Sequence, residues 1–293
     1  AMTTRLLELG IEELGEPPVP WAWFALGSQA RRERGIAGDQ DHLLVLEDGA
    51  DDGADAYFAA LATRVVEGLD AAGVPRCPSN VMASERAWRR TRTGWSDAFR
   101  SWIEEPASHA AFVTAIAFDR RKVAGALDVG GWASLVAAAG RHAGFVHRSM
   151  RLALEQRPPL GLLGTVRTTR ADGDGARVDL KAGGLLPVVD LARALAIAAG
   201  STELGTLARL REARTAGILE ADDADAMIAA FGLLLELRLE HHVRRAGAAL
   251  PVDDLVDPGE LDPIARGGLR EAFRAIAHVQ ERLGREMSAS RLR

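Results

Sequence analysis

The first 130 residues alternate between two hydrophobic periods. Short apolar runs at 21–27 and 41–48 are bounded by turn-forming or acidic residues, which is typical of buried strands. Residues 51–73 instead carry apolar side chains at spacings of three and four, which predicts a helix. A third strand is expected around 114–119, with a helix as the alternative. Strands that alternate with helices indicate layers of sheet and helix.

The second half of the chain has a helical period almost throughout. One stretch, 165–181, differs because Thr and Val flank a Gly/Asp centre. This favours a β-hairpin with an ordinary turn over a calcium loop, since the remaining calcium ligands are missing. The other stretches are rich in Ala and Leu and predict an antiparallel helical bundle, with helices at 132–156, 187–199, 203–216, 221–247 and 262–287. We therefore expect two domains, 1–140 and 141–293.

Composition agrees with a soluble, globular chain. The 293 residues are 47% hydrophobic and 26% charged, and the net charge of −5 disfavours binding to a nucleic-acid backbone. No apolar run approaches the roughly 20 residues that span a bilayer, and no signal peptide is visible. The single cysteine, Cys77, excludes an internal disulfide and has no evident activating base. A cytoplasmic protein without a membrane partner is expected.

Two carboxylates, Asp39 and Asp41, stand one residue apart where the second apolar run begins. Alternate residues of an extended chain point to the same side, so both should share one face with Cα atoms roughly 6–7 Å apart. Two like charges that close are costly unless a cation neutralises them. Because Mg²⁺ prefers carboxylates together with phosphate oxygens, the pair predicts a site for Mg²⁺, with Mn²⁺ as the second candidate.

Residues near this pair are suited to phosphate. Gly27 and Ser28 end the first apolar run, where glycine permits close approach of backbone N–H groups to an anion. Arg31 and Arg32 follow within reach of a triphosphate tail. Asp119, which ends the third predicted strand, is a candidate third metal ligand that could also accept the proton of an attacking hydroxyl. Together these groups indicate phosphoryl or nucleotidyl transfer.

The stretch GSQARRERGIAGDQD (27–41) resembles the nucleotidyltransferase superfamily of the DNA polymerase β type, in which Gly-Ser or Gly-Gly precedes Asp-x-Asp. The chain is more closely similar to bacterial relatives of the uridylyltransferase that modifies the nitrogen-signalling PII protein. These relatives often follow cyclic-nucleotide-binding and CBS regulatory domains. The further stretches that carry this resemblance are GVPRCPSNVMASERAW (73–88), FDRRKVAG (118–125), KAGGLLPVVDLARALAIAAG (181–200), LRLEHH (237–242) and RGGLREAFRAIAHVQERL (266–283).

The resemblance implies an α+β fold. A small mixed-sheet nucleotidyltransferase domain would be followed by an α-helical bundle domain, labelled substrate-binding in the family, that here carries a short β-hairpin. It also implies that Glu33 follows Arg31 in the family's Arg-x-Glu, and we expect Glu33 to pair with an arginine. The sequence departs from the family pattern at Ala30, where Gly is usual, and at Gly38, where Ser or Thr is common. By position the resemblance assigns the triphosphate to Gly27, Ser28 and Arg31, the metals to Asp39 and Asp41, and the general base to Asp119.

These features predict a Mg²⁺-dependent transferase. It would move a nucleoside monophosphate from an NTP to a hydroxyl of a protein or small-molecule acceptor and release pyrophosphate. The alternative is a catalytically silent nucleotide-binding signalling module. A regulatory-domain partner and a homo-oligomer are both open, no sequence-specific nucleic acid is expected, and the sequence does not choose among ATP and the other NTPs.

Two further groups are interpreted as structural. Trp88, Trp95 and Trp102 repeat every seven residues and are expected in the core rather than stacked on a base. His241 and His242 are adjacent on a predicted helix, so their side chains diverge by about 100°. They cannot chelate one metal from that helix alone and are expected to serve packing or the surface.

Overall fold

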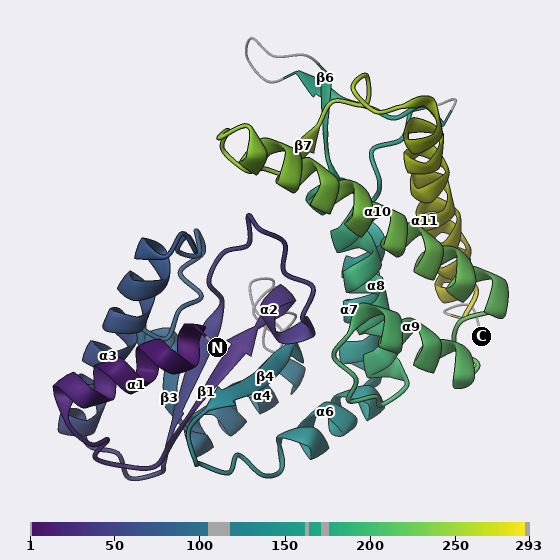
Figure 1. Cartoon of the computed structure of the whole chain (residues 1–293). Helices are drawn as coiled ribbons and strands as arrows, with labels where there is room; N and C mark the ends of the chain where they lie inside the picture. The colour runs from purple at the N-terminus through teal and green to yellow at the C-terminus, as the bar shows by residue number, and fades with distance from the viewer. Residues whose placement is uncertain (1, 105–117, 162–163, 171–175, 291–293) are drawn as a thin grey trace. The chain divides into compact units, whose positions relative to one another are not determined.

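The computed structural model describes residues 2–104, 118–161, 164–170 and 176–290 (Figure 1). The chain forms two compact units, Ala1–Val136 and Ala137–Arg293. The first contains a four-stranded mixed sheet with helices, and the second consists mainly of helices with a short three-stranded sheet. This is the α+β class that the sequence predicts. Among the described residues, no helix has both the length and the apolar character needed to cross a bilayer.

The sheet of the first unit has the strand order β3-β2-β1-β4. Strand β1 runs antiparallel to both β2 and β4, and β2 runs parallel to β3. The elements of this unit are α1 (Met2–Leu14), β1 (Trp21–Leu26), α2 (Gly27–Arg31), β2 (His42–Leu46), α3 (Asp52–Ala71), η1 (Arg86–Trp88), β3 (Arg89–Thr91), α4 (Arg92–Glu104) and β4 (Arg120–Ala124). The two apolar runs and the helix predicted over 51–73 are therefore confirmed.

Both faces of this sheet are buried, because alternate residues of β1 enter different cores. Trp21 and Trp23 pack with residues of α1 and α3, whereas Phe24 and Leu26 pack with residues of α4. A strand covered on both faces reads as a continuous apolar run, which explains why β1 and β2 are clear in the sequence. Helix α3 begins where the sequence predicts, with the Asp51 carboxylate accepting a hydrogen bond from the Ala54 N–H at 2.8 Å.

The tryptophans that repeat every seven residues do serve the core. Trp95 is fully buried and Trp88 nearly so, with their ring centroids 6.0 Å apart. Trp102 packs edge-on against Phe99 at a centroid distance of 5.4 Å. The expectation of core packing for this series is confirmed.

The strand predicted around 114–119, with a helix as the alternative, falls mainly on residues that the structure does not describe, and the described residues Phe118 and Asp119 are not in a strand. Residues 114–117 lie outside the described part of the chain, and β4 starts after Asp119 rather than ending there. Strand β4 is an edge strand whose side chains are half-buried or exposed, so it carries no apolar run for sequence analysis to detect. Arg120 fixes its start, because the guanidinium lies 4.9 Å from the ring centroids of both Phe99 and Trp132. Burial lowers the pKa of Arg120 to about 10.

The second unit is built around the almost entirely buried helix α8. Strands β5 and β6 pair antiparallel, as the predicted hairpin requires, whereas the turn between them, residues 171–175, lies outside the described residues. Strand β6 also pairs with the distant strand β7. The elements of this unit are α7 (Ala143–Glu155), β5 (Thr169–Arg170), β6 (Ala176–Asp179), a π-helical turn η2 (Lys181–Leu185), α8 (Leu186–Ala198), α9 (Thr206–Thr215), α10 (Ala221–Gly247), β7 (Leu255–Val256) and α11 (Pro263–Ser290), and the boundary between the units falls within α6 (Trp132–Arg141).

The single helix expected over 132–156 is two helices. The chain leaves the helical conformation at His142, whose imidazole Nδ1 accepts a hydrogen bond from the Phe145 N–H at 3.2 Å and caps α7. Gly140, the next-to-last residue of α6, lets this helix end lie close to α8, because a Cβ atom there would lie 2.4 Å from the carbonyl oxygen of Ile197. The break is not predicted from the sequence because the apolar period continues through it and because the capping residue is a histidine.

Candidate active site

Three segments meet where strand β1 ends and strands β2 and β4 begin. Because β1 is antiparallel to both neighbours, its C-terminal end lies beside the starts of β2 and β4. The Leu26 N–H donates to the carbonyl oxygen of Asp41 at 2.9 Å, and the Gly27 N–H donates to the carbonyl oxygen of Asp119 at 2.9 Å. The Gly27-Ser28 turn and two of the predicted acidic positions are therefore adjacent.

Asp39 and Asp41 present their carboxylates together. One ligand oxygen from each, and the Sγ atom of Cys77, all lie within 4.8 Å of one another. Gly27 adopts a positive φ of 53°, and a Cβ atom there would lie 3.2 Å from Oδ2 of Asp41. Glycine thus brings the backbone turn close to the acidic pair. Two neighbouring carboxylate oxygens suit Mg²⁺ or Mn²⁺, so the residues fit the metal that the sequence suggests.

Two buried polar residues alternate with the acids and hold this segment. The Gln40 amide Nε2 donates to the carbonyl oxygens of Val66 at 3.1 Å and Val74 at 2.9 Å. The His42 Nδ1 accepts from the Ala83 N–H at 2.9 Å, which leaves its Nε2 facing the Gln40 Oε1 at 3.3 Å. The acids therefore extend from a segment whose opposite side is anchored to three separate backbone positions.

Burial keeps the His42 imidazole neutral. The side chain is inaccessible to solvent, its ring centroid lies 4.6 Å from that of Trp23, and burial lowers its pKa to about 3. A neutral ring can accept the Ala83 N–H and donate to Gln40 at the same time. At neutral pH, His42 therefore holds the segment that carries the acids in place through these two hydrogen bonds.

Arg34 is the cation that faces the acidic pair. Its Nη2 donates to the Gly38 carbonyl oxygen at 2.5 Å, and the charges of Asp39 and Asp41 favour its protonated form. Burial dominates, however, and leaves the pKa of Arg34 below its ordinary value. A Cβ atom on Gly38 would lie 2.4 Å from Cγ of Arg34, which gives a steric reason for glycine at this position.

A second ionic group joins Arg31, Glu33 and Asp119. The Arg31 Nε donates to Oε2 of Glu33 at 2.7 Å, which confirms the expected pairing of Glu33 with an arginine. Another nitrogen of Arg31 pairs with Oδ2 of Asp119, whose side chain is inaccessible to solvent. Within the described ranges, Asp119 is not a member of the Asp39–Asp41–Cys77 group. Its role as a third metal ligand stays a prediction.

The remaining predicted site residues lie on and after α2. The Ser28 carbonyl oxygen accepts the Glu33 N–H at 2.9 Å, and Arg32 ends the helix with a positive φ of 61° and an exposed side chain. The Arg121 guanidinium donates to the carbonyl oxygens of Gln29 at 3.1 Å and Ala30 at 3.2 Å, which ties α2 to β4. Contact of Ser28, Arg31 or Arg32 with a triphosphate stays a prediction.

Comparison with protein-family models assigns both parts of the chain. Residues 1–109 match the model described as "Putative nucleotidyltransferase DUF294", and residues 143–287 match the model described as "Putative nucleotidyltransferase substrate binding domain". The chain belongs to this nucleotidyltransferase family. Membership of the family points to nucleotidyl transfer as the class of activity and to a transferase as the class of enzyme. A search of curated proteins finds no match.

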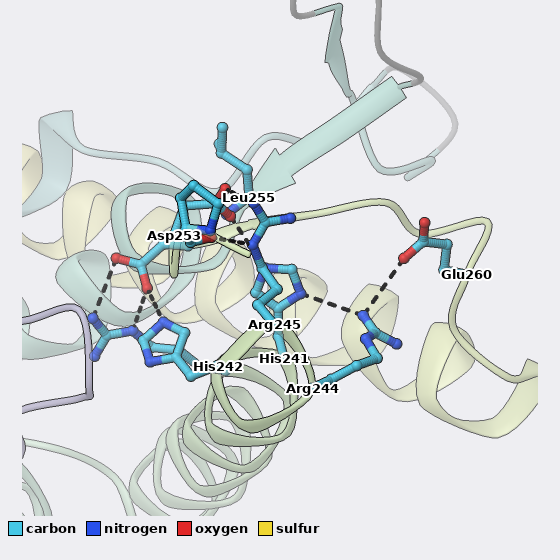
Figure 2. Close-up of polar contacts among 10 residues, drawn as sticks. His241, His242, Arg244, Arg245, Asp253, Leu255 and Glu260 are labelled. Carbon is cyan, nitrogen blue, oxygen red and sulfur yellow. Dashed lines mark hydrogen bonds and ion pairs between the residues drawn. The ribbon is translucent and has the colours of Figure 1, made fainter. Parts of the chain in front are cut away.

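The part of the chain that matches the substrate-binding model contains a second polar cluster, at the C-terminal end of α10 (Figure 2). His242 Nε2 lies 2.8 Å from Oδ1 of Asp254, and Arg238 Nε donates to the same carboxylate at 2.6 Å. His241 Nε2 lies 3.1 Å from Oδ1 of Asp253. The two imidazoles hold different carboxylates, which agrees with their expected divergence and with a role in packing.

Sequence analysis missed four residues that shape the acidic site. Gln40 and His42 could have been found from the alternation, because two polar residues at inward positions of a buried strand require internal partners. No sequence signal places Arg34 or Cys77, since both reach the site through loops whose course the periodicity does not determine. The proximity of Cys77 to the acids is visible only in three dimensions.

Proposed function

We propose that this chain is a Mg²⁺-dependent nucleotidyltransferase that moves a nucleoside monophosphate from an NTP to a hydroxyl of a protein or small-molecule acceptor. The convergence of the Asp39 and Asp41 carboxylates beside the Gly27 turn carries this proposal. Paired carboxylates next to a backbone turn that can approach an anion form a combined site for a divalent cation and a polyphosphate. Family membership supports the same class of reaction.

Asp39 and Asp41 would hold the divalent ion, with Mn²⁺ as the other candidate. When bound, Mg²⁺ supplies positive charge that offsets the charge developing on the phosphate oxygens. Gly27 and Ser28 would bind the triphosphate through the backbone turn at the end of β1. Arg34, already in the electrostatic field of both acids, would balance their charge in the absence of the ion.

Arg31 and Asp119 form an ion pair that a nucleotide could reorganise. We propose that Arg31 exchanges the Asp119 carboxylate for the triphosphate, with exposed Arg32 as an additional contact. Asp119 would then accept the proton of the acceptor hydroxyl. The acceptor oxygen forms a bond to the α-phosphorus, the bond between that phosphorus and the oxygen bridging to the β-phosphate breaks, and pyrophosphate leaves with that oxygen.

The test uses the four NTPs, each labelled at the α-phosphate, with Mg²⁺ and a bacterial lysate as the source of acceptors. We expect transfer of label and matching release of pyrophosphate. Asp39→Asn and Asp41→Asn should each lower both signals at least about 100-fold, because even residues that only support a metal ligand are worth about 10–100-fold. Arg31→Ala should chiefly raise the KM for the NTP.

Asp52→Asn is the matched control, since Asp52 is an exposed acid on α3 of the same unit. It should transfer label at the rate of the unchanged protein. Labelling that persists in Asp39→Asn would contradict the proposal. Nucleotide binding by thermal shift without pyrophosphate release under any of the four NTPs would instead favour the silent signalling module.

A further inference from the structure

The Asp39–Asp41 pair has a sulfur neighbour that the transfer reaction does not require. Cys77 comes from the loop between α3 and η1, 36 residues after Asp41, yet its Sγ lies within 4.8 Å of a carboxylate oxygen of each acid. Its side chain is only 6% exposed. Three potential ligand atoms from two segments therefore surround one point, and one of them, the sulfur of Cys77, is a soft donor.

Backbone hydrogen bonds hold Cys77 in this position. The Gln40 N–H donates to the Pro75 carbonyl oxygen at 3.0 Å, and the His42 N–H donates to the Val81 carbonyl oxygen at 3.1 Å. The loop from 75 to 81 is thus fastened at both ends to the residues on either side of Asp41. These anchors hold the loop beside the acids, and the Cys77 Sγ lies close to both carboxylates, so the three donors are brought together by the fold.

We propose that Asp39, Asp41 and Cys77 form a three-donor site for a thiophilic divalent cation such as Zn²⁺ or Cd²⁺. Sites with three protein ligands and an open fourth position are common for Zn²⁺, with Zn–S near 2.3 Å and Zn–O about 2.0–2.2 Å. Donor atoms within 4.8 Å of one another need only small side-chain rotations to reach those distances. Mg²⁺ gains nothing from sulfur, so the thiol favours the soft cations.

Binding replaces the thiol proton with the metal. The Cys77 S–H bond breaks, its proton passes to solvent, and the thiolate and two carboxylates bind the cation with no change in oxidation state. A water molecule would complete the coordination. If the chain has the function proposed above, this cation occupies the place of Mg²⁺ and inhibits transfer. That consequence depends on the proposed function, whereas binding itself does not.

The test is a titration of the metal-free protein with Cd²⁺, followed by the ultraviolet charge-transfer absorption that a Cd²⁺–thiolate bond produces. Cys77 is the chain's single cysteine, so any such absorption reports this residue alone. We expect saturation at one Cd²⁺ per chain. Cys77→Ser should abolish the absorption, and Asp39→Asn and Asp41→Asn should each retain it with an affinity at least about 10-fold weaker.

Asp52→Asn, exposed on α3, serves as the matched acidic control and should titrate like the unchanged protein. No absorption in the unchanged protein, or acid variants that bind Cd²⁺ with the affinity of the unchanged protein, would overturn the proposal. The acid variants leave the buried cysteine intact, so they decide the matter even if Cys77→Ser does not fold. Absorption without NTP-dependent labelling would uphold this site and refute the function, and the opposite pair of results would do the reverse.

Discussion

Each unit contains a pair of aspartates just before a strand of its sheet, and the two pairs have different neighbours. In the second unit, Asp254 receives Arg238 at 2.6 Å, and Asp253 lies 3.0 Å from a nitrogen of Arg245. In the first unit, Asp39 and Asp41 lie close to each other and to a thiol, and Arg34 interacts electrostatically with both. Matched charges stabilise the fold around Asp253 and Asp254, whereas adjacent like charges favour a bound cation.

The pKa values in the second unit agree with a structural role. Burial acts to raise the pKa of Asp254, but the hydrogen bonds and charges of Arg238 and His242 outweigh it and leave that pKa below its ordinary value. Asp253 has a pKa lowered in the same way by His241 and Arg245, together with the Leu255 N–H. Both carboxylates are therefore stabilised as anions by the protein itself.

The largest expected effect comes from removing the Asp254 carboxylate, which pairs with Arg238 and His242. Asp254→Ala leaves Arg238 and His242, with side chains 6% and 0% exposed, without this carboxylate. We expect a loss of about 3–5 kcal/mol in the free energy of unfolding of the second unit, because removal of one partner leaves a buried charge uncompensated. Urea unfolding followed by far-UV circular dichroism measures it.

Two controls make this measurement specific. Asp253→Ala, in the same loop, should cost less, because the Asp253 carboxylate is 32% exposed and that of Asp254 is 14% exposed. All six tryptophans belong to the first unit, so tryptophan fluorescence follows that unit alone and should change little. Equal costs for the two variants would contradict the difference in burial on which the argument depends.

A fall in pH should destabilise the first unit before the second, the reverse of the effect of Asp254→Ala. His42 has a pKa of about 3 in the folded protein and an ordinary value of 6.5, so the unfolded chain takes up a proton that the folded chain does not. The contribution of neutral His42 to the free energy of unfolding is complete above pH 6.5 and decreases as the pH falls from 6.5 towards 3. The slope approaches about 1.4 kcal/mol per pH unit. Asp253 and Asp254 lose their contribution only below their ordinary value of 3.8.

The slope of the first unit's unfolding free energy against pH is measured by tryptophan fluorescence between about pH 6.5 and 4.5. Trp23 lies beside the His42 ring. His42→Asn retains an oxygen that can accept the Ala83 N–H but cannot take up a proton. It should be less stable than the unchanged protein at neutral pH and should have a flatter dependence on pH. Parallel curves for the two proteins would show that another group controls the acid sensitivity of the first unit.

The predictability of the fold depends on how its elements are buried. Strands β1 and β2 and helix α3 could be read from the sequence because one continuous apolar run or one helical period defines each. The edge strand β4 could not, because its first residue, Arg120, is placed by aromatic rings distant in sequence. The break at His142 could not either, because the apolar period continues through it and the cap is a histidine. Strand β7 pairs with β6 across more than 70 residues and leaves no local signal.

The candidate site follows the same division. The proximity of Asp39 and Asp41 follows from the alternation of an extended chain, which depends only on local geometry. The ion pair of Asp119 with Arg31 and the approach of Cys77 depend on which strands become neighbours, which no local pattern specifies. Sequence analysis therefore predicts the carboxylate chemistry of the site, and the structure adds the sulfur of Cys77 as a further potential donor.

The smallest expected effect tests whether Gly38 is required by Arg34, the cation that faces Asp39 and Asp41. Gly38→Ser introduces a Cβ atom that would lie 2.4 Å from Cγ of Arg34, and we expect a loss of about 1–2 kcal/mol in the unfolding free energy of the first unit. Arg34→Ala removes the atoms that collide, so Gly38→Ser should cost about 1 kcal/mol less in that background. Tryptophan fluorescence during urea unfolding provides the four values. An equal cost in both backgrounds would locate the strain in the backbone, and the Arg34 side chain would then not explain why glycine stands before the acidic pair.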